Sequence, residues 1–152
     1  MKAVIQRVLD ASVSINGAET RSIGRGLLIL LGVQATDDVG VCEKLAHKCA
    51  GLRIFDDAEG NLNLSAEEMG YEALVVSNFT LYGDTRKGKR PSFIRAAKPP
   101  LSTDGYARFV EALRGTGLAR VVTGEFGADM QITLTNDGPV TIVIETDDWK
   151  NS

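Results

Sequence analysis

The sequence contains few of the side chains on which many enzyme active sites depend. Among its 152 residues it has one histidine, His47, and two cysteines, Cys42 and Cys49. A Ser-His-Asp triad requires a well-placed imidazole, and zinc sites draw on several cysteines and histidines. His47 lies between Lys44 and Lys48 in a helical pattern, where we expect an exposed residue. The composition therefore disfavours both kinds of chemistry, and we expect no metal and no cofactor.

The two cysteines, Cys42 and Cys49, fall in the same predicted helix. Their spacing corresponds to a helical rise of about 10 Å, which is too long for a disulfide. We therefore expect both thiols to be reduced and partly buried.

Long hydrophobic runs are also missing. No apolar segment approaches the roughly 20 residues that a membrane-spanning helix requires, and Gln6 and Arg7 interrupt the N-terminal segment before a signal peptide could form. We therefore expect a cytoplasmic protein without a membrane segment. The length suits one domain, which we place at residues 1–146, followed by a frayed tail at 147–152 in which Trp149 can dock.

A basic stretch stands out on an acidic background. The formal net charge is −3, yet no acidic residue occurs between Asp84 and Asp104. Such a stretch suits contact with one phosphate backbone, although a solvated surface loop would have the same composition. It holds six of the 17 lysines and arginines, namely Arg86, Lys87, Lys89, Arg90, Arg95 and Lys98.

The hydrophobic pattern predicts seven or eight strands. Short alternating or apolar segments between turn residues are typical of strands. The run at 27–33 is apolar on both faces, which favours a central, fully buried strand. The predicted strands cover residues 2–8, 11–15, 27–33, 53–55, 73–81, 120–126, 130–135 and 140–145.

Two helices are predicted between these strands. The first begins at Asp37 or Asp38, and the second at Ser102, Thr103 or Asp104. Most strands lie too close together in sequence for helical crossovers. We therefore expect a single α+β domain with a curved, largely antiparallel or mixed, barrel-like sheet and two main helices outside it. The predicted buried faces are Val41, Leu45, Cys49 and Leu52 in the first helix, and Tyr106, Phe109, Val110 and Leu113 in the second.

Two segments could carry chemistry. In the first, Ser77, Asn78 and Thr80 end a hydrophobic strand, where polar residues are either ordinary edge residues or the wall of a pocket whose N–H groups hold an oxyanion. In the second, residues 136–141 predict a turn between two strands. A cis Gly138–Pro139 bond there would form a stiff wall next to a substrate α-carbon.

Eight short motifs follow one another along nearly the whole chain. They are VIQRV at 4–8, ASV at 11–13, GLL at 26–28, RIF at 53–55, SNFTL at 77–81, RPSF at 90–93, GADMQ at 127–131 and NDGPVT at 136–141. Each motif alone is weak, but their order and spacing are specific. Together they resemble the D-aminoacyl-tRNA deacylases, formerly called D-tyrosyl-tRNA deacylases.

The resemblance implies a homodimeric ester hydrolase that acts on D-aminoacyl-tRNA, with its active sites at the dimer interface. Ser77, Asn78, Phe79 and Thr80 match the motif that lines the pocket for the aminoacylated terminal adenosine. Asn78 departs from the family pattern, which has glutamine there. Catalysis in the family relies on water, backbone N–H groups and the 2′-hydroxyl of the adenosine.

The remaining site residues follow from the same resemblance. Gly138 and Pro139 match a cis motif that reaches into the partner's pocket and rejects L-amino acids, while D-amino acids and glycine fit. Arg7 matches the arginine that orients this motif, and Phe126 and Met130 match residues around the adenosine. From charge alone we also expect Arg86, Lys87, Lys89 and Arg90 to contact the tRNA backbone, with no DNA partner.

Three alternatives remain open at this point. A non-enzymatic RNA-binding module would bind tRNA without deacylating it. An enzyme of the same fold that edits L-aminoacyl-tRNA would have the Gly138–Pro139 bond trans. A small-molecule hydrolase would act on simple D-amino-acid esters.

Overall fold

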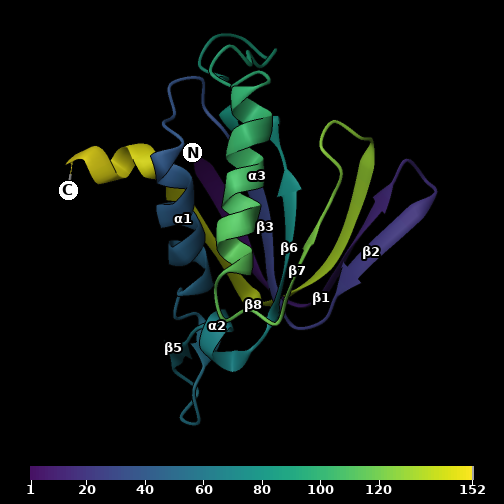
Figure 1. Ribbon diagram of the computed structural model, residues 1–152, viewed down its shortest axis with the longest axis vertical. Coiled ribbons are helices and arrows are strands. Elements are labelled where there is room, and N and C mark those ends of the chain that lie inside the picture. Colours follow the sequence, from purple (N-terminus) through teal and green to yellow (C-terminus); the bar gives the residue numbers. More distant parts are fainter. Residues whose placement is uncertain (152) are drawn as a thin grey trace.

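The computed structural model of the protein describes residues 1–151, in which the chain forms eight β-strands, three α-helices and two 3-10 helices (Figure 1). The strands are β1 (Lys2–Ile15), β2 (Glu19–Ile23), β3 (Gly26–Gly32), β4 (Phe55–Asp56), β5 (Leu62–Leu64), β6 (Glu72–Ser77), β7 (Arg120–Thr123) and β8 (Met130–Glu145). The helices are α1 (Gly40–Ala50), α2 (Ala66–Met69), α3 (Leu101–Arg114), η1 (Phe79–Tyr82) and η2 (Thr146–Asn151).

Six strands form one mixed sheet in the order β2-β1-β3-β6-β7, with β8 on the other edge of β1. Strand β1 pairs antiparallel with β3 through its first half, with β2 through its second half and with β8 along its length. Strands β3, β6 and β7 run parallel. The register between β1 and β8 shifts on both sides of Val8, and the sheet curls sharply at this point, as Figure 1 shows.

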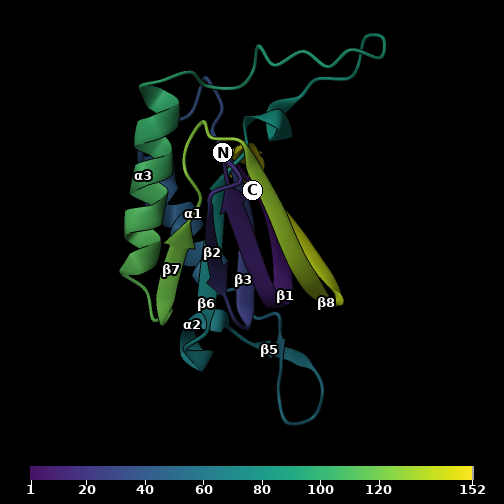
Figure 2. The same ribbon diagram turned by 90° about the vertical axis from the view of Figure 1, so that its right-hand side faces the viewer.

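Strand β3 is apolar on both faces because both faces are covered. Leu27 and Ile29 belong to a core cluster with Leu45 of α1 and Phe109 of α3. Leu28 faces the other way, into a second cluster that the curled sheet encloses. Helices α1 and α3 lie on one side of the sheet (Figure 2). The expected single α+β domain, with a barrel-like mixed sheet and two main helices outside, is confirmed.

Several predicted strand boundaries were wrong. Residues 2–8 and 11–15 belong to one strand, β1, and residues 130–135 and 140–145 both belong to β8. The turn expected at residues 136–141 is therefore a bulge within β8, because both halves of β8 pair with β1. The strand expected at 73–81 ends at Ser77, after which the chain enters η1.

The helix starts also differ from the prediction. Asp37 does not cap α1, because its carboxylate accepts hydrogen bonds from the Met1 ammonium at 2.7 Å and from the Gln34 N–H at 2.6 Å. Asp38 does accept a bond from the Gly40 N–H at 2.9 Å. Helix α3 begins before the predicted caps, with Pro100 as its N-cap.

The two cysteines and the C-terminal tail pack against the body of the protein. Cys42 and Cys49 are free and fully buried, and burial raises the pKa of the Cys49 thiol to about 12. Of the tail expected at 147–152, residues 147–151 belong to the 3-10 helix η2, and residue 152 lies outside the described residues. Trp149 packs against the core, and the Lys44 ammonium lies 4.5 Å from its ring centroid.

Two further expectations from the sequence concern the exposure of His47 and the presence of membrane-spanning helices. His47 is exposed on α1, as expected. Within residues 1–151, no helix has both the length and the apolar character that spanning a membrane requires.

Candidate active site

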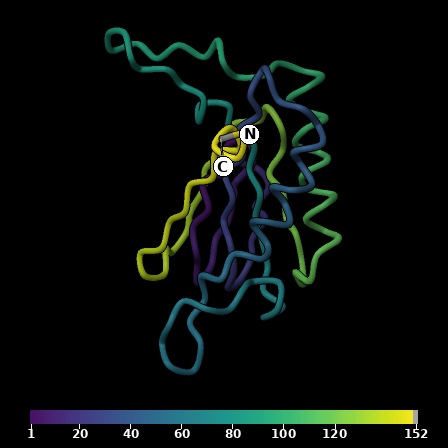
Figure 3. Tube along the Cα trace, turned by 90° about the vertical axis from the view of Figure 1, so that its left-hand side faces the viewer, coloured from purple at the N-terminus to yellow at the C-terminus, as the bar shows by residue number. Residues whose placement is uncertain are grey.

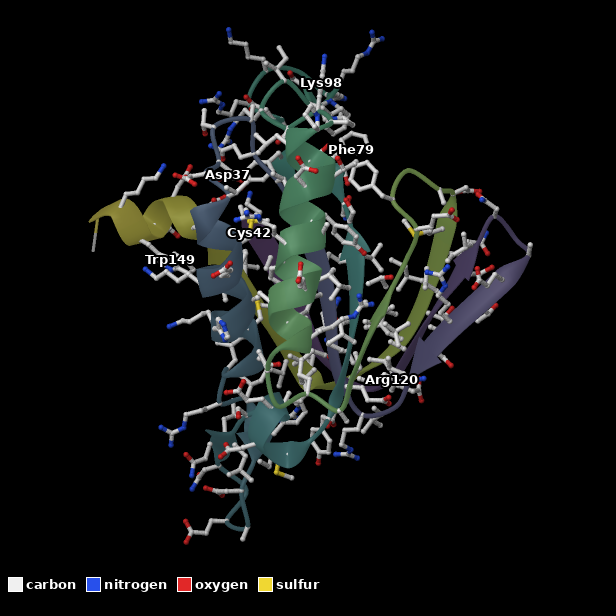
Figure 4. All side chains as sticks on the ribbon, in the orientation of Figure 1. Asp37, Cys42, Phe79, Lys98, Arg120 and Trp149 are labelled. Atoms are coloured by element: carbon white, nitrogen blue, oxygen red, sulfur yellow. The ribbon has the colours of Figure 1, made fainter. Side chains whose placement is uncertain are left out.

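A pocket of about 510 Å³ lies where the parallel strands β3, β6 and β7 reach their carboxyl ends. This is the edge at which open sheets with parallel strands commonly bind ligands. Figure 4 shows Phe79 and Lys98 near this end of the molecule and Arg120 near the opposite end. The lining residues are Val33, Ser77, Asn78, Phe79, Phe93, Ala96, Ala97, Lys98, Pro99, Ser102, Phe126, Gly127, Ala128 and Met130.

The first wall of the pocket is the junction between β6 and η1. The Asn78 N–H still donates to the Leu31 carbonyl at 2.8 Å, as a continuing strand would. Its side chain then caps η1, because the amide oxygen accepts from the Thr80 N–H at 3.2 Å and from the Thr80 hydroxyl. The amide oxygen of Asn78 is therefore engaged within the chain, and its NH₂ group is the end free to meet a ligand.

One backbone N–H at this junction has no acceptor within residues 1–151. It belongs to Phe79, the first residue of η1, whose side chain is largely exposed and packs edge-on against Phe93 at a centroid distance of 5.2 Å. The first N–H groups of a helix have no intrahelical partner, so they are available to an oxygen atom of a ligand. The Thr80 N–H, by contrast, is already bonded to Asn78.

The opposite wall is apolar and aromatic. Phe126 follows β7 and packs against Tyr106 of α3 at a centroid distance of 6.2 Å. The Tyr106 hydroxyl donates to the Val75 carbonyl at 3.0 Å, and burial raises the pKa of Tyr106 to about 12, which keeps this donor protonated. Met130 starts β8 and lies close against Gly124. Phe126 and Met130 thus give this part of the pocket an aromatic ring and a thioether, both of which favour contact with a flat ring of a ligand.

The Gly138–Pro139 segment lies outside the pocket. Its peptide bond is cis, and both residues are exposed at the tip of the β8 bulge. The side chain of Arg7 is buried beneath it and donates from Nε to the Asp137 carbonyl at 2.9 Å and from a terminal nitrogen to the Ile54 carbonyl at 2.9 Å. The tip is therefore held from below by a fixed guanidinium.

The sheet register separates this tip from the pocket. Ser77 of β6 pairs with Leu31 of β3, and Leu31 pairs with Ala3 of β1. Asn136, next to the tip, pairs with Val8 of β1. The five residue-to-residue steps from Ala3 to Val8 span about 17 Å of strand. Figure 3 shows the tip of β8, in yellow-green, projecting from the body of the molecule. Within one chain, the tip does not line the pocket.

The basic stretch forms an arm that reaches away from the body of the protein (Figures 2 and 3). Paired backbone hydrogen bonds between Asp84 and Ser92 close its base. The Arg86 guanidinium lies 2.7 Å from the Asp84 carboxylate, and this ion pair lowers the pKa of Asp84 to about 2. Lys87, Lys89 and Arg90 are exposed and have no ion-pair partner within residues 1–151, so most of the positive charge of the arm stays uncompensated.

The structure thus brings together part of the predicted site. Ser77, Asn78, Phe79, Phe126 and Met130 line one pocket. Thr80 adjoins it through its bonds to Asn78, whereas Arg7, Gly138 and Pro139 lie at the far end of the sheet.

One wall of the pocket was not predicted as part of the site, although Phe93 belongs to one of the motifs and Lys98 to the basic stretch. That wall includes Phe93, residues 96–99 and Ser102. Ser102 was predicted only as a candidate cap of the second helix, because nothing in its local sequence indicates that it is buried beside a pocket. No cluster of three or more His, Cys, Asp or Glu side chains within the described chain could hold a metal ion.

Residues 4–145 match the family described as D-Tyr-tRNA(Tyr) deacylase. The D-aminoacyl-tRNA deacylase of Chloroflexus aurantiacus is 56% identical over 146 residues, which cover 96% of this chain and 91% of the relative. The D-aminoacyl-tRNA deacylase of Porphyromonas gingivalis is 52% identical over 146 residues, covering 96% and 97% of the two chains.

Two solved structures share the fold. One, named c-Myc DNA Unwinding Element Binding Protein, matches with a TM-score of 0.88 and 40% identity over 95% of this chain and 98% of its own. The other, described as a probable eukaryotic D-amino acid tRNA deacylase, has a TM-score of 0.83 and 17% identity over 94% and 97% of the two chains.

Proposed function

Because the chain belongs to the D-Tyr-tRNA(Tyr) deacylase family, we propose that it hydrolyses the ester bond of D-aminoacyl-tRNA and releases the free D-amino acid and tRNA. The observation that carries this proposal is the pocket itself. It combines an aromatic wall for a nucleobase with an unpaired N–H at Phe79 that can hold the ester carbonyl. We place the enzyme in the cytoplasm, where charged tRNA is used.

In the proposed complex the terminal adenosine stacks against Phe126 and Met130. The ester then lies toward the β6–η1 junction, where the Phe79 N–H donates to the carbonyl oxygen. Water adds to the carbonyl carbon, and the negative charge that develops on the oxygen is stabilised by this donor. The bond between the carbonyl carbon and the ribose oxygen then breaks, and the ribose oxygen takes up the proton that water gives up. The neighbouring 2′-hydroxyl is placed to relay that proton.

Thr80 has no part as a nucleophile in this scheme. Its hydroxyl proton is directed at the Asn78 amide oxygen, which is a weak base. A nucleophilic hydroxyl requires a partner that takes its proton, such as an imidazole. An aminoacyl ester is already reactive, so positioning of water and stabilisation of the oxyanion are sufficient.

We further propose that the active enzyme is a homodimer in which the Gly138–Pro139 tip of one subunit closes the pocket of the other. Two features support this arrangement. The tip is exposed and held by Arg7, yet it lies about 17 Å of strand away from the pocket of its own chain. In addition, within the described residues β8 pairs only with β1, which leaves its outer edge, with Val143 61% exposed, free to pair with another chain.

The tip would act as a chiral filter. Gly138 has no side chain, so the wall can approach the substrate α-carbon closely. An L-amino acid would direct its side chain into this wall, whereas a D-amino acid directs it outward and glycine has none. Discrimination by a steric wall requires no affinity for the side chain, so the enzyme would accept many D-amino acids.

The basic arm would hold the acceptor end of the tRNA. Lys87, Lys89 and Arg90 carry exposed charge, and Lys98 lies on the pocket wall where the arm meets the body. Positive charge continuous with the pocket mouth would follow the phosphates that precede the terminal adenosine.

The test is parallel hydrolysis of D-Tyr-tRNA and L-Tyr-tRNA by the purified protein, with and without a chelator. We expect release of tyrosine from the D ester alone, at a rate that the chelator does not change. Binding of tRNA without release from either ester would contradict the proposal and indicate a binding module.

A further inference from the structure

One buried side chain of the pocket has no hydrogen-bond partner within residues 1–151. Ser102, in the first turn of α3, is 7% exposed, and its hydroxyl is the one buried side-chain polar atom without a partner within residues 1–151. Leaving a buried hydroxyl unpaired costs stability, because the group gives up its bonds to water. Such atoms are rare in folded proteins, so this one requires a reason.

Nothing in the helix explains the arrangement. A serine in a helix commonly turns its hydroxyl to the carbonyl four residues earlier, which here belongs to Lys98. That carbonyl accepts from the backbone N–H of Ser102 at 3.2 Å but, within residues 1–151, not from the Ser102 hydroxyl. The next residue, Thr103, does satisfy its hydroxyl, which donates to the Pro100 carbonyl at 3.0 Å. Ser102 and Thr103 thus lie in the same turn, but only the Thr103 hydroxyl is paired within the described residues, and only Ser102 lines the pocket.

The surroundings of Ser102 contain little else that could pair with a ligand. Its neighbours along this wall are Ala96, Ala97 and Pro99, and Val33 closes the wall from the end of β3. The other polar side chains of the pocket are Lys98, on this wall, and Ser77 and Asn78, on the β6–η1 side. A ligand that reached this apolar wall would find one hydroxyl there, able both to donate and to accept.

We propose that Ser102 is a substrate-binding residue whose hydroxyl forms a hydrogen bond with the purine nucleoside at the 3′ end of the tRNA. This inference rests on the proposed function, which puts that nucleoside in the pocket. The contact orients the nucleoside with respect to the Phe79 N–H and takes no part in bond cleavage. The pocket would then recognise the nucleoside by a hydrogen bond as well as by stacking on Phe126.

The experiment compares the wild type with Ser102→Ala and with Thr103→Ala as the matched control. Steady-state hydrolysis of D-Tyr-tRNA gives kcat and KM, and thermal melting reports the fold. Loss of one neutral hydrogen bond corresponds to a factor of about three to ten in binding. We therefore expect Ser102→Ala to raise KM by that factor with little change in kcat. Its melting temperature should stay the same or rise, because an unpaired buried hydroxyl is removed.

A binding experiment identifies the atom that is contacted. The probe is 3′-amino-3′-deoxyadenosine acylated with D-tyrosine, whose amide resists hydrolysis, together with versions that lack the 2′-hydroxyl or the 6-amino group. If Ser102 bonds one of these groups, removing the group weakens binding to the wild type but not to Ser102→Ala. Coupling with either analogue supports the proposal.

Two results would overturn it. One is an unchanged KM for Ser102→Ala together with an absence of coupling to both analogues. The other is a KM that rises equally in Thr103→Ala, since that would assign the effect to the helix end as a whole. The outcome is separable from the proposed function, because an inactive wild type would refute the deacylase assignment, whereas an active wild type with an unaffected Ser102→Ala refutes only the nucleoside contact.

Discussion

Replacing Gly138 with alanine tests whether the tip of β8 completes the pocket of a second subunit. Gly138 has φ +141°, and an added Cβ would lie 2.8 Å from Cγ2 of Val140 and 3.4 Å from the Arg7 guanidinium. The first distance is too short for a real contact, so the tip must move. A displacement of about 1 Å in a positioning group can lower the rate by roughly 10²-fold. We expect a loss of that order for D-Tyr-tRNA, together with a changed ratio of D to L hydrolysis.

Heterodimers make the test decisive. Phe79→Pro damages the pocket by removing its N–H, whereas Gly138→Ala damages the tip. If pocket and tip belong to different subunits, a heterodimer of the two single variants has one intact site and keeps about half of the wild-type activity. A heterodimer of the wild type with the double variant then has no intact site and is nearly inactive.

The assay is deacylation of D-Tyr-tRNA by heterodimers that are co-expressed with two different affinity tags and purified through both. The reverse pattern, in which the pair of single variants is inactive and the wild type with the double variant keeps half of the activity, would refute action between subunits. Equal activity in the two heterodimers would show that the tip has no part in the reaction.

Three further predictions concern single residues. Phe79→Pro should lower kcat by about 10²–10³-fold, because it removes the N–H that stabilises the oxyanion. Phe79→Ala keeps this N–H and should lower kcat far less. Equal losses of rate for the two variants in single-turnover kinetics would argue against the Phe79 N–H as the donor. Thr80→Ala should keep substantial activity in the same assay, because its hydroxyl proton faces the Asn78 amide oxygen, and a loss as deep as that of Phe79→Pro would indicate that Thr80 is the nucleophile. Asp37→Ala should lower the free energy of unfolding by about 2 kcal/mol in urea titrations, because the buried Met1 ammonium would lose the carboxylate 2.7 Å away and keep only the Thr146 hydroxyl at 2.6 Å and the Glu145 carboxylate at 4.0 Å; a change within about 0.5 kcal/mol would indicate that water replaces the carboxylate.

The parts of the fold that the sequence predicted are those where burial leaves a periodic pattern. The run at 27–33 is apolar at every position because β3 is covered on both faces. Phe109 and Leu113 recur at helical spacing because one side of α3 faces that core. In both β3 and α3 the packing environment stays the same along the whole element, so the local sequence pattern predicts the element correctly.

The strands β1 and β8 were harder to predict because each changes its environment halfway. Val8 is fully buried, whereas the next residue, Leu9, is 40% exposed. The register shifts at this point interrupt the alternation, so a bent strand has the same pattern as two strands. At residues 136–139 the turn signals are genuine, yet pairing with β1 continues on both sides of them.

The residues of the candidate site likewise fall into those that local sequence could predict and those that it could not. Ser77 and Phe126 were predicted because their motifs resemble those of a known family, and the structure places both in one pocket. Ser102 could not be predicted in this way. It lines the pocket together with residues such as Val33 and Phe126, which come from distant parts of the sequence.

The composition of the pocket wall also determines how the enzyme should respond to acidity. Lys98 is the only charged side chain among the residues that line the pocket in the described chain. An active site with an acid and a base has a bell-shaped pH–rate profile, whose limbs report the pKa values of those groups. Here the rate should instead rise steadily with hydroxide concentration, following the intrinsic reactivity of the ester. The protein would supply shape, a donor and the exclusion of the wrong enantiomer, and it would leave the proton chemistry to water and to the substrate.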